Sequence, residues 1–193
     1  MPLSKIDSDS LNTGAVTSTA LGTGAVTSAA MGTASVASAA LASGVPTRAQ
    51  LPAGSVLQVV NFSLVSSAST SSSSDQATGL VASITPTFTT SKILIFVTPY
   101  MRATQGSSTG NCFAYLKLWR GAITSGTLLV NGYPIVGAQN ADFRGVGAMN
   151  YYDSPATTSS TTYTVSMNSS FAASVGINET TNPSSITLME IAA

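Results

Sequence analysis

Acidic side chains are the residues of this sequence that could most directly do chemistry. Two carboxylates facing each other across a cleft can hydrolyse a glycosidic bond. Asp153 stands before Ser-Pro, which favours a turn, and Glu190 lies in a strand-like C-terminal segment where we expect it to be half-buried or paired with an arginine. We therefore expect the carboxylates to serve the fold and the protein not to be an enzyme. The acidic residues beyond position 50 are Asp75, Asp142, Asp153, Glu179 and Glu190.

Nucleophilic and metal chemistry lack their usual residues. The sequence has no histidine and a single cysteine, Cys112, so a catalytic triad has no imidazole base and a Cys/His zinc site has too few ligands. Lys92 and Lys117 fall within strand patterns, where we expect them on an exposed edge or face. No glycine-rich stretch ends in the Gly-Lys-Ser/Thr of a phosphate-binding loop. We expect no catalytic residue, no cofactor and no metal.

Binding residues are better represented than catalytic ones. Phe113, Tyr115 and Trp119 share one face of a strand pattern, where aromatic rings could stack on sugars or form part of the core or of an oligomer interface. Segments 104–111 and 131–143 are predicted loops, and loops on a rigid scaffold often carry recognition. The candidate receptor-contact residues in these loops and beside them are Asn111, Asn131, Asn140, Asp142 and Arg144.

Short strands must position these residues. Alternating or continuous apolar runs separated by turn residues predict eight or nine strands and no helix beyond residue 55, which is typical of a β-sandwich or jelly roll. The run 93–97 has no polar face and should be a central strand. Segment 66–74 reads as a serine-rich loop and 131–134 as a turn. The predicted strands are 56–65, 79–85, 93–97, 112–119, 128–130, 146–152, 161–167, 171–177 and 186–191.

A five-residue repeat occupies positions 6–45. The first place of each unit is aliphatic or Met, the third is Ser or Thr, and the fifth is small. A fixed period over this length predicts repeated structure. The apolar first places, which we predict to form the core of an oligomeric stalk, are Ile6, Leu11, Val16, Leu21, Val26, Met31, Val36 and Leu41.

One copy of the repeat cannot bury these side chains. In a helix, residues five apart lie about 140° apart around the axis, and in a strand they alternate between faces. Several copies wound about one axis could bring the apolar residues together, so we predict a homotrimeric stalk. A flexible Ala/Ser/Thr-rich linker is the alternative. The predicted organisation is an anchor at 1–5, the stalk at 6–45, a neck at 46–54 and the head at 55–193.

Charge and hydropathy exclude several partners. Only 7% of the 193 residues are charged and the net charge is zero, which argues against nucleic acid and anionic membranes as partners. No apolar run approaches the ~20 residues of a membrane helix, so we expect no membrane insertion. The N-terminus lacks the apolar core of a signal peptide, and we expect assembly in a cytoplasm.

From residue 51 onward the sequence resembles the C-terminal domains of fibre and appendage proteins of tailed phages, especially cyanophages. The matching segments are LPAGSVLQVV (51–60), VASITPTFTTSKILIFV (81–97), YYDSPATTSSTTYTV (151–165) and SSITLMEI (184–191), and the GAVTS repeat resembles their stalks. The resemblance implies a homotrimeric virion protein with a jelly-roll head. Its N-terminus would bind other virion proteins, and its head would bind a glycan or protein on the host surface.

Several virion roles remain open from the sequence. A tail fibre and a head fibre share these features, and the main alternative is a capsid decoration protein that stabilises the shell. A glycan-active head domain is a third and less favoured interpretation.

Overall fold

The computed structural model describes residues 48–104, 112–138, 142–169, 174–178 and 182–193. The predicted anchor, the stalk and its eight apolar core positions lie outside these residues, as do Asn111, Asn140 and Glu179.

Strands dominate the described residues, after one short 3-10 helix at Arg48–Gln50. The predicted all-β class is confirmed. The strands are β1 (Val56–Leu64), β2 (Ala68–Thr70), β3 (Gln76–Ile84), β4 (Lys92–Thr98), β5 (Tyr100–Thr104), β6 (Cys112–Arg120), β7 (Thr127–Ala138), β8 (Asp142–Val146), β9 (Met149–Asp153), β10 (Thr161–Ser169), β11 (Ser174–Ile177) and β12 (Ser184–Ile191).

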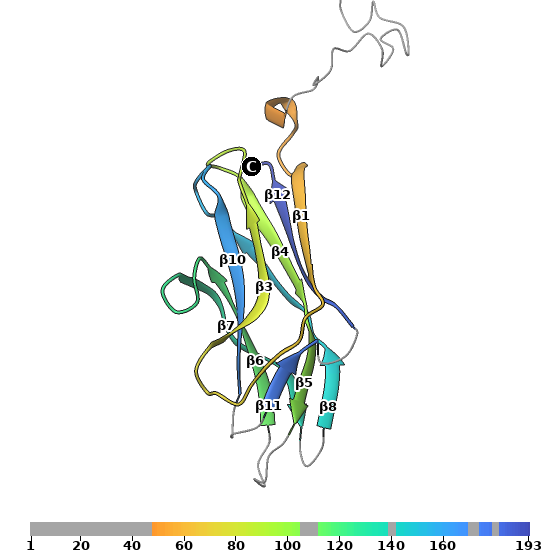
Figure 1. The fold of residues 1–193 in the computed structure, drawn as a ribbon. Coiled ribbons are helices and arrows are strands. Elements are labelled where there is room, and N and C mark those ends of the chain that lie inside the picture. The colour runs from red at the N-terminus through yellow and green to blue at the C-terminus, as the bar shows by residue number, and fades with distance from the viewer. Residues whose placement is uncertain (1–47, 105–111, 139–141, 170–173, 179–181) are drawn as a thin grey trace, which may run out of the picture. The chain divides into compact units, whose positions relative to one another are not determined.

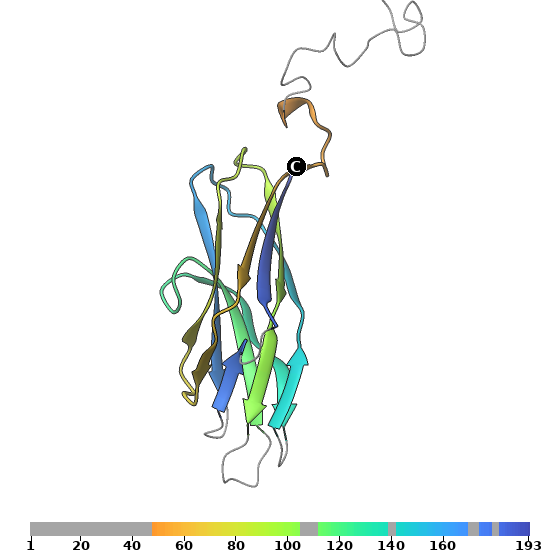
Figure 2. The same ribbon diagram turned by 45° about the vertical axis from the view of Figure 1, so that its right-hand side comes forward.

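These strands form three antiparallel four-stranded sheets. We call them the β1 sheet (order β1-β12-β4-β9), the β3 sheet (β3-β10-β6-β7) and the β5 sheet (β2-β11-β5-β8). The β1 and β3 sheets face each other, and the β5 sheet lies at the end of the domain opposite to residue 48 and the C-terminus (Figures 1 and 2).

The β5 sheet continues the β1 sheet. Each strand of the β1 sheet is next in the chain to the strand at the same position in the order of the β5 sheet. The pairs are β1 with β2, β12 with β11, β4 with β5, and β9 with β8. Pro99, which has no amide hydrogen, separates β4 from β5. Each such pair can be counted as one pass of the chain along the domain. The layer made of the β1 and β5 sheets then has the order 1-8-3-6, and the β3 sheet has the order 2-7-4-5. This arrangement is consistent with the predicted jelly roll.

The core lies between the two layers, because alternate residues of each strand point inward. The central strands supply its largest fully buried side chains, among them Ile93 and Ile95 of β4, Leu188 of β12, and Tyr163 of β10. As predicted, 93–97 lies in a central strand, β4, between β12 and β9. In β6 the alternation is also confirmed, with Ala114, Leu116 and Leu118 fully buried.

Several predictions about local structure are wrong. The serine-rich loop 66–74 contains a strand, β2, which pairs with β11. The predicted turn at 131–134 lies within β7, where Asn131 and Gly132 form a bulge opposite β6 and Gly132 has a φ of 56°. A left-handed glycine serves a bulge as well as a turn. The predicted strand 146–152 is divided between β8 and β9 at Gly147 and Ala148.

Candidate functional site

Glu190 is a completely buried carboxylate near the end of the head where the chain enters. It accepts hydrogen bonds from Gln58 Nε2 at 2.6 Å and Ser91 Oγ at 2.6 Å. The backbone amide and the hydroxyl of Thr87 also donate to it. The expectation that Glu190 would be half-buried or paired with an arginine is therefore wrong, because neutral donors surround it.

These donors keep Glu190 ionised. Burial by itself raises its pKa, but the hydrogen bonds from Ser91, Gln58 and Thr87 outweigh that effect and leave the pKa below its ordinary value. A carboxylate held in this way stays negatively charged and does not act as a general acid at neutral pH. Glu190 instead fastens β12 to β1 and to the connection between β3 and β4.

Asp153 is the second buried carboxylate, and it joins the two layers. It ends β9 in the β1 sheet and accepts hydrogen bonds from Arg120 Nη1 at 3.1 Å and from Tyr163 Oη at 2.7 Å, both in the β3 sheet. The expectation of a turn residue is therefore wrong. Burial first, and then the bond to Asp153, raises the pKa of Tyr163, so the phenol stays protonated and donates.

The two buried carboxylates occupy one cross-strand row. Ile93 is paired with Glu190 on one side and with Asp153 on the other, which sets the carboxylate-bearing strands roughly 10 Å apart. Ile93 is fully buried between them. Among the described residues, no buried side-chain nitrogen or oxygen lacks a hydrogen-bond partner. The geometry assigns both groups to holding the sandwich together.

Asp75 is also engaged in structural contacts. It lies just before β3 and accepts hydrogen bonds from Lys117 Nζ at 2.9 Å and from Asn168 Nδ2 at 2.8 Å. Lys117 is consequently half-buried in an ion pair, whereas we expected it to be exposed. Trp119 lies on the same outer face of β6 and is only 7% exposed, with its indole donating to Ser166 Oγ at 2.8 Å.

A charged cluster lies on the outer face of the β5 sheet. Asp142 accepts from Arg102 Nε at 2.7 Å and from Arg144 Nη2 at 3.3 Å. Arg102 and Arg144 are paired directly across β5 and β8, so Asp142 offsets the repulsion between two neighbouring guanidinium groups. The hydrogen bond from Arg102 is the main reason that the pKa of Asp142 is lowered, and it acts against the effect of burial, which raises that pKa. The two guanidinium groups of the cluster offer donors of the kind that bind anionic groups.

The structure therefore gathers some of the candidate receptor-contact residues and separates others. Asp142 and Arg144 lie together in β8, and Asn131 lies in β7 of a different sheet. All three belong to strands, so the predicted loop 131–143 is wrong over 131–138 and 142–143. Asn111 and Asn140 lie outside the described residues. Sequence reasoning missed Arg102, although the alternation of Tyr100, Arg102 and Thr104 after Pro99 was a signal for an exposed strand face.

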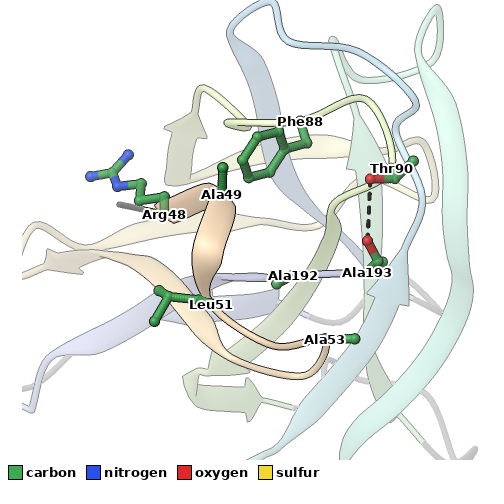
Figure 3. A pocket seen from close by; sticks show the side chains of 8 residues that line it. All are labelled: Arg48, Ala49, Leu51, Ala53, Phe88, Thr90, Ala192 and Ala193. Atoms are coloured by element: carbon green, nitrogen blue, oxygen red, sulfur yellow. Dashed lines mark hydrogen bonds between the residues drawn. The ribbon is translucent and has the colours of Figure 1, made fainter. Parts of the chain in front are cut away.

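A pocket of about 220 Å³ opens at the other end of the domain (Figure 3). The neck residues, the connection after β3 and the last residues of the chain form its walls. Thr90 Oγ1 donates to the Ala193 carbonyl at 3.4 Å beside it. Six of its eight lining residues have apolar side chains, and no acidic side chain contributes to it. The lining residues are Arg48, Ala49, Leu51, Ala53, Phe88, Thr90, Ala192 and Ala193.

Among the residues that the structure describes, no group of three or more metal-ligating side chains gathers in one place. Within the same residues, no helix has the length and apolar character needed to cross a membrane.

Comparisons with known proteins yield a weak structural similarity. No protein-family model and no curated protein sequence matches this chain. Among solved structures, the chain is similar to the infectious bursal disease virus VP2 subviral particle, with 10% sequence identity and a TM-score of 0.36. The match covers 72% of this chain and 38% of that chain, and at this level of similarity it carries no functional argument.

Proposed function

We propose that this protein is a non-enzymatic structural protein of a virion, a short homotrimeric phage fibre. In this proposal the N-terminus attaches to other virion proteins, residues 6–45 form the trimeric stalk, and the jelly-roll head adheres to a glycan or protein on the host surface. The resemblance of residues 51–191 to phage appendage domains supports the virion role, and the five-residue repeat supports the stalk.

One observation about the head carries the adhesive role. The chain enters the head at residue 48, close to the C-terminus, whereas the β5 sheet lies at the opposite end (Figure 1). The Arg102–Asp142–Arg144 cluster on that sheet is therefore remote from the entry point. An N-terminally attached fibre would present this end outward, where the arginine side chains of the cluster could bind an acidic surface sugar.

The absence of catalysis is part of the proposal. The four described carboxylates that we weighed as catalytic, Asp75, Asp142, Asp153 and Glu190, each accept at least two hydrogen bonds. Groups engaged in this way hold elements together, which supports a structural protein.

Binding to cells tests the adhesive role. Fluorescently labelled protein is titrated onto cyanobacterial strains, in parallel with purified capsids. We expect saturable binding to a susceptible strain, which Arg144→Ala weakens at least tenfold. Arg48→Ala, which alters an exposed arginine at the opposite end, should bind like the wild type. Binding that is equal in all three proteins would contradict the assignment of the cluster.

A capsid decoration protein is the second candidate. The outer face of the β1 sheet exposes several large apolar side chains, among them Val59 and Tyr152, each more than half exposed. Such a face could rest on a capsid shell. Tight binding to purified capsids without binding to cells would favour this role over the fibre.

A further inference from the structure

The outer face of the β1 sheet is unusually apolar for a surface. One cross-strand row runs over all four strands and contains Val59, Met189, Leu94 and Tyr152. Phe96 is 40% exposed and is the one apolar residue of the neighbouring row, which otherwise contains Asn61, Thr187 and Asn150. Val56 and Ile191 are paired at the end of the sheet where the chain enters. Contiguous exposed apolar patches of this kind mark interaction sites.

The outer face of the β3 sheet mixes polar and apolar residues. There the β3 sheet presents Ser83 paired with Thr162, and Thr164 next to Val81. Lys117 and Asn168 continue its polar surface. One of its rows contains Val81, Thr164, Trp119 and Leu128, so it is interrupted by a threonine and its tryptophan is nearly buried. The β1 sheet differs because its apolar row is not interrupted by a polar residue.

Strand β4 has apolar residues on both of its faces. Its five central residues, 93–97, are all apolar, which is typical of a strand buried on both faces. Ile93, Ile95 and Val97 fill the core, while Leu94 and Phe96 remain partly or largely exposed. Among the described residues nothing covers this second face.

We propose that a second copy of this chain covers the outer face of the β1 sheet, so that the heads associate with each other as well as the stalks. This inference rests on the homotrimer of the proposed function and identifies the surface of the head that it uses. Apart from Lys92 at its end, the face has no charged side chain in the rows described. Like faces can therefore meet without charge repulsion.

The position of the repeat favours a second copy over an unrelated partner. In the proposed fibre, residues 6–45 bury their apolar positions among several copies, and the chain enters the head at the edge of this same sheet. Gly54 donates to the Ala192 carbonyl at 2.8 Å, and Ala192 donates to the Ser55 carbonyl at 2.9 Å. These bonds tie the entering segment to the end of β12, so copies joined before residue 48 would hold their β1 sheets close together.

The size of the face indicates that it assists association and does not drive it alone. Three rows across four strands cover on the order of 400 Å² at ordinary strand spacings. A stable interface commonly buries about 800 Å² on each partner. The local concentration that a shared stalk provides would make up the difference.

Cysteine accessibility in the full chain tests the inference. In a Cys112→Ala background, Phe96→Cys places a thiol on the proposed interface, and Val81→Cys is its control on the β3 sheet. The two native side chains are 40% and 41% exposed within one subunit. We expect a maleimide to label the thiol at position 96 at least tenfold more slowly than that at position 81, and at equal rates in denaturant. Tyr152→Cys provides a second interface position.

The outcomes separate this inference from the proposed function. Equal labelling rates in a protein whose native mass is oligomeric would overturn the covered face and leave the homotrimer standing. Slow labelling at position 96 in a monomer would mean that the chain's own N-terminal residues cover the face, which contradicts both. Slow labelling in an oligomer, with a short bismaleimide joining two chains through position 152, is the result that supports the inference.

Discussion

Buried carboxylates illustrate how single residues stabilise this head. Glu190 brings a negative charge into the sandwich and satisfies it with four hydrogen bonds from three residues. Asp153 does the same with an arginine and a tyrosine of the opposite layer. Removing any partner of such a buried charge lowers the stability of the fold strongly, because the remaining group is then buried without a hydrogen bond.

Glu190→Gln should lower the free energy of unfolding by about 2–3 kcal/mol at pH 7, since the amide cannot accept from all the donors around it. Chemical denaturation measures this. Asp142→Asn, at an exposed carboxylate, should cost less than about 1 kcal/mol. Equal losses in the two variants would contradict the role given to Glu190.

The pH dependence of stability follows from the lowered pKa of Glu190. Because the folded state binds this proton less readily than the unfolded chain, Glu190 contributes its full stabilisation above its ordinary value of 4.5. That contribution is lost as the pH falls through the lower folded pKa. We expect the wild type to lose more stability than Glu190→Gln between pH 5 and about pH 3, as measured by thermal unfolding.

At the scale of elements, the junction between the β1 and β5 sheets depends on Asn178. Its side-chain amide donates to the carbonyl of Leu64 at 2.8 Å and to that of Ser66 at 3.1 Å, and its carbonyl accepts from Ser184 Oγ. Ser184 in turn accepts from the Tyr100 amide at 2.8 Å. Three of the four chain passes that cross between the two sheets are therefore joined at one buried residue.

Asn178→Ala should destabilise the head by about 3 kcal/mol, because it removes the donor to the buried Leu64 carbonyl and places alanine at a φ of 55°. Asn178→Gly removes the same hydrogen bonds without the backbone cost. We expect Asn178→Gly to be about 1 kcal/mol more stable than Asn178→Ala, as measured by denaturant titration. A glycine variant less stable than the alanine variant would contradict the backbone part of this account.

The bulge in β7 gives a second prediction at this scale. Nothing lies within 4 Å of a Cβ built on Gly132, so the cost of a substitution there is conformational. Gly132→Val should destabilise by roughly 1–2 kcal/mol, and Gly132→Asn by less, because asparagine tolerates the left-handed region. Thermal melts of the two variants would test this order.

Periodicity in the sequence was sufficient to predict most of the strands, because alternation reports directly on which side of a strand is buried. It predicted 93–97 as a central strand and the inward face of β6. It could not distinguish a glycine at a turn from a glycine at a bulge, as at Gly132, since both need the same backbone conformation. The charged cluster escaped detection because Arg102 and Asp142, 40 residues apart, meet only through strand pairing.

In the whole molecule, the proposed fibre requires residues 6–45 to associate with their counterparts in other copies. Leu21 is a predicted core position, and Thr23 is a neighbouring polar one. Leu21→Asp should shift the full chain toward smaller species in size-exclusion chromatography with light scattering, because a charge at the stalk axis would be buried without a partner. Thr23→Asp, with the same added charge, should leave the mass close to that of the wild type.

Native mass spectrometry of the full chain tests the central claim most directly. Three copies of the 19.4 kDa chain in one particle is the result that the account predicts. A folded species of 19.4 kDa that persists at high protein concentration would contradict it.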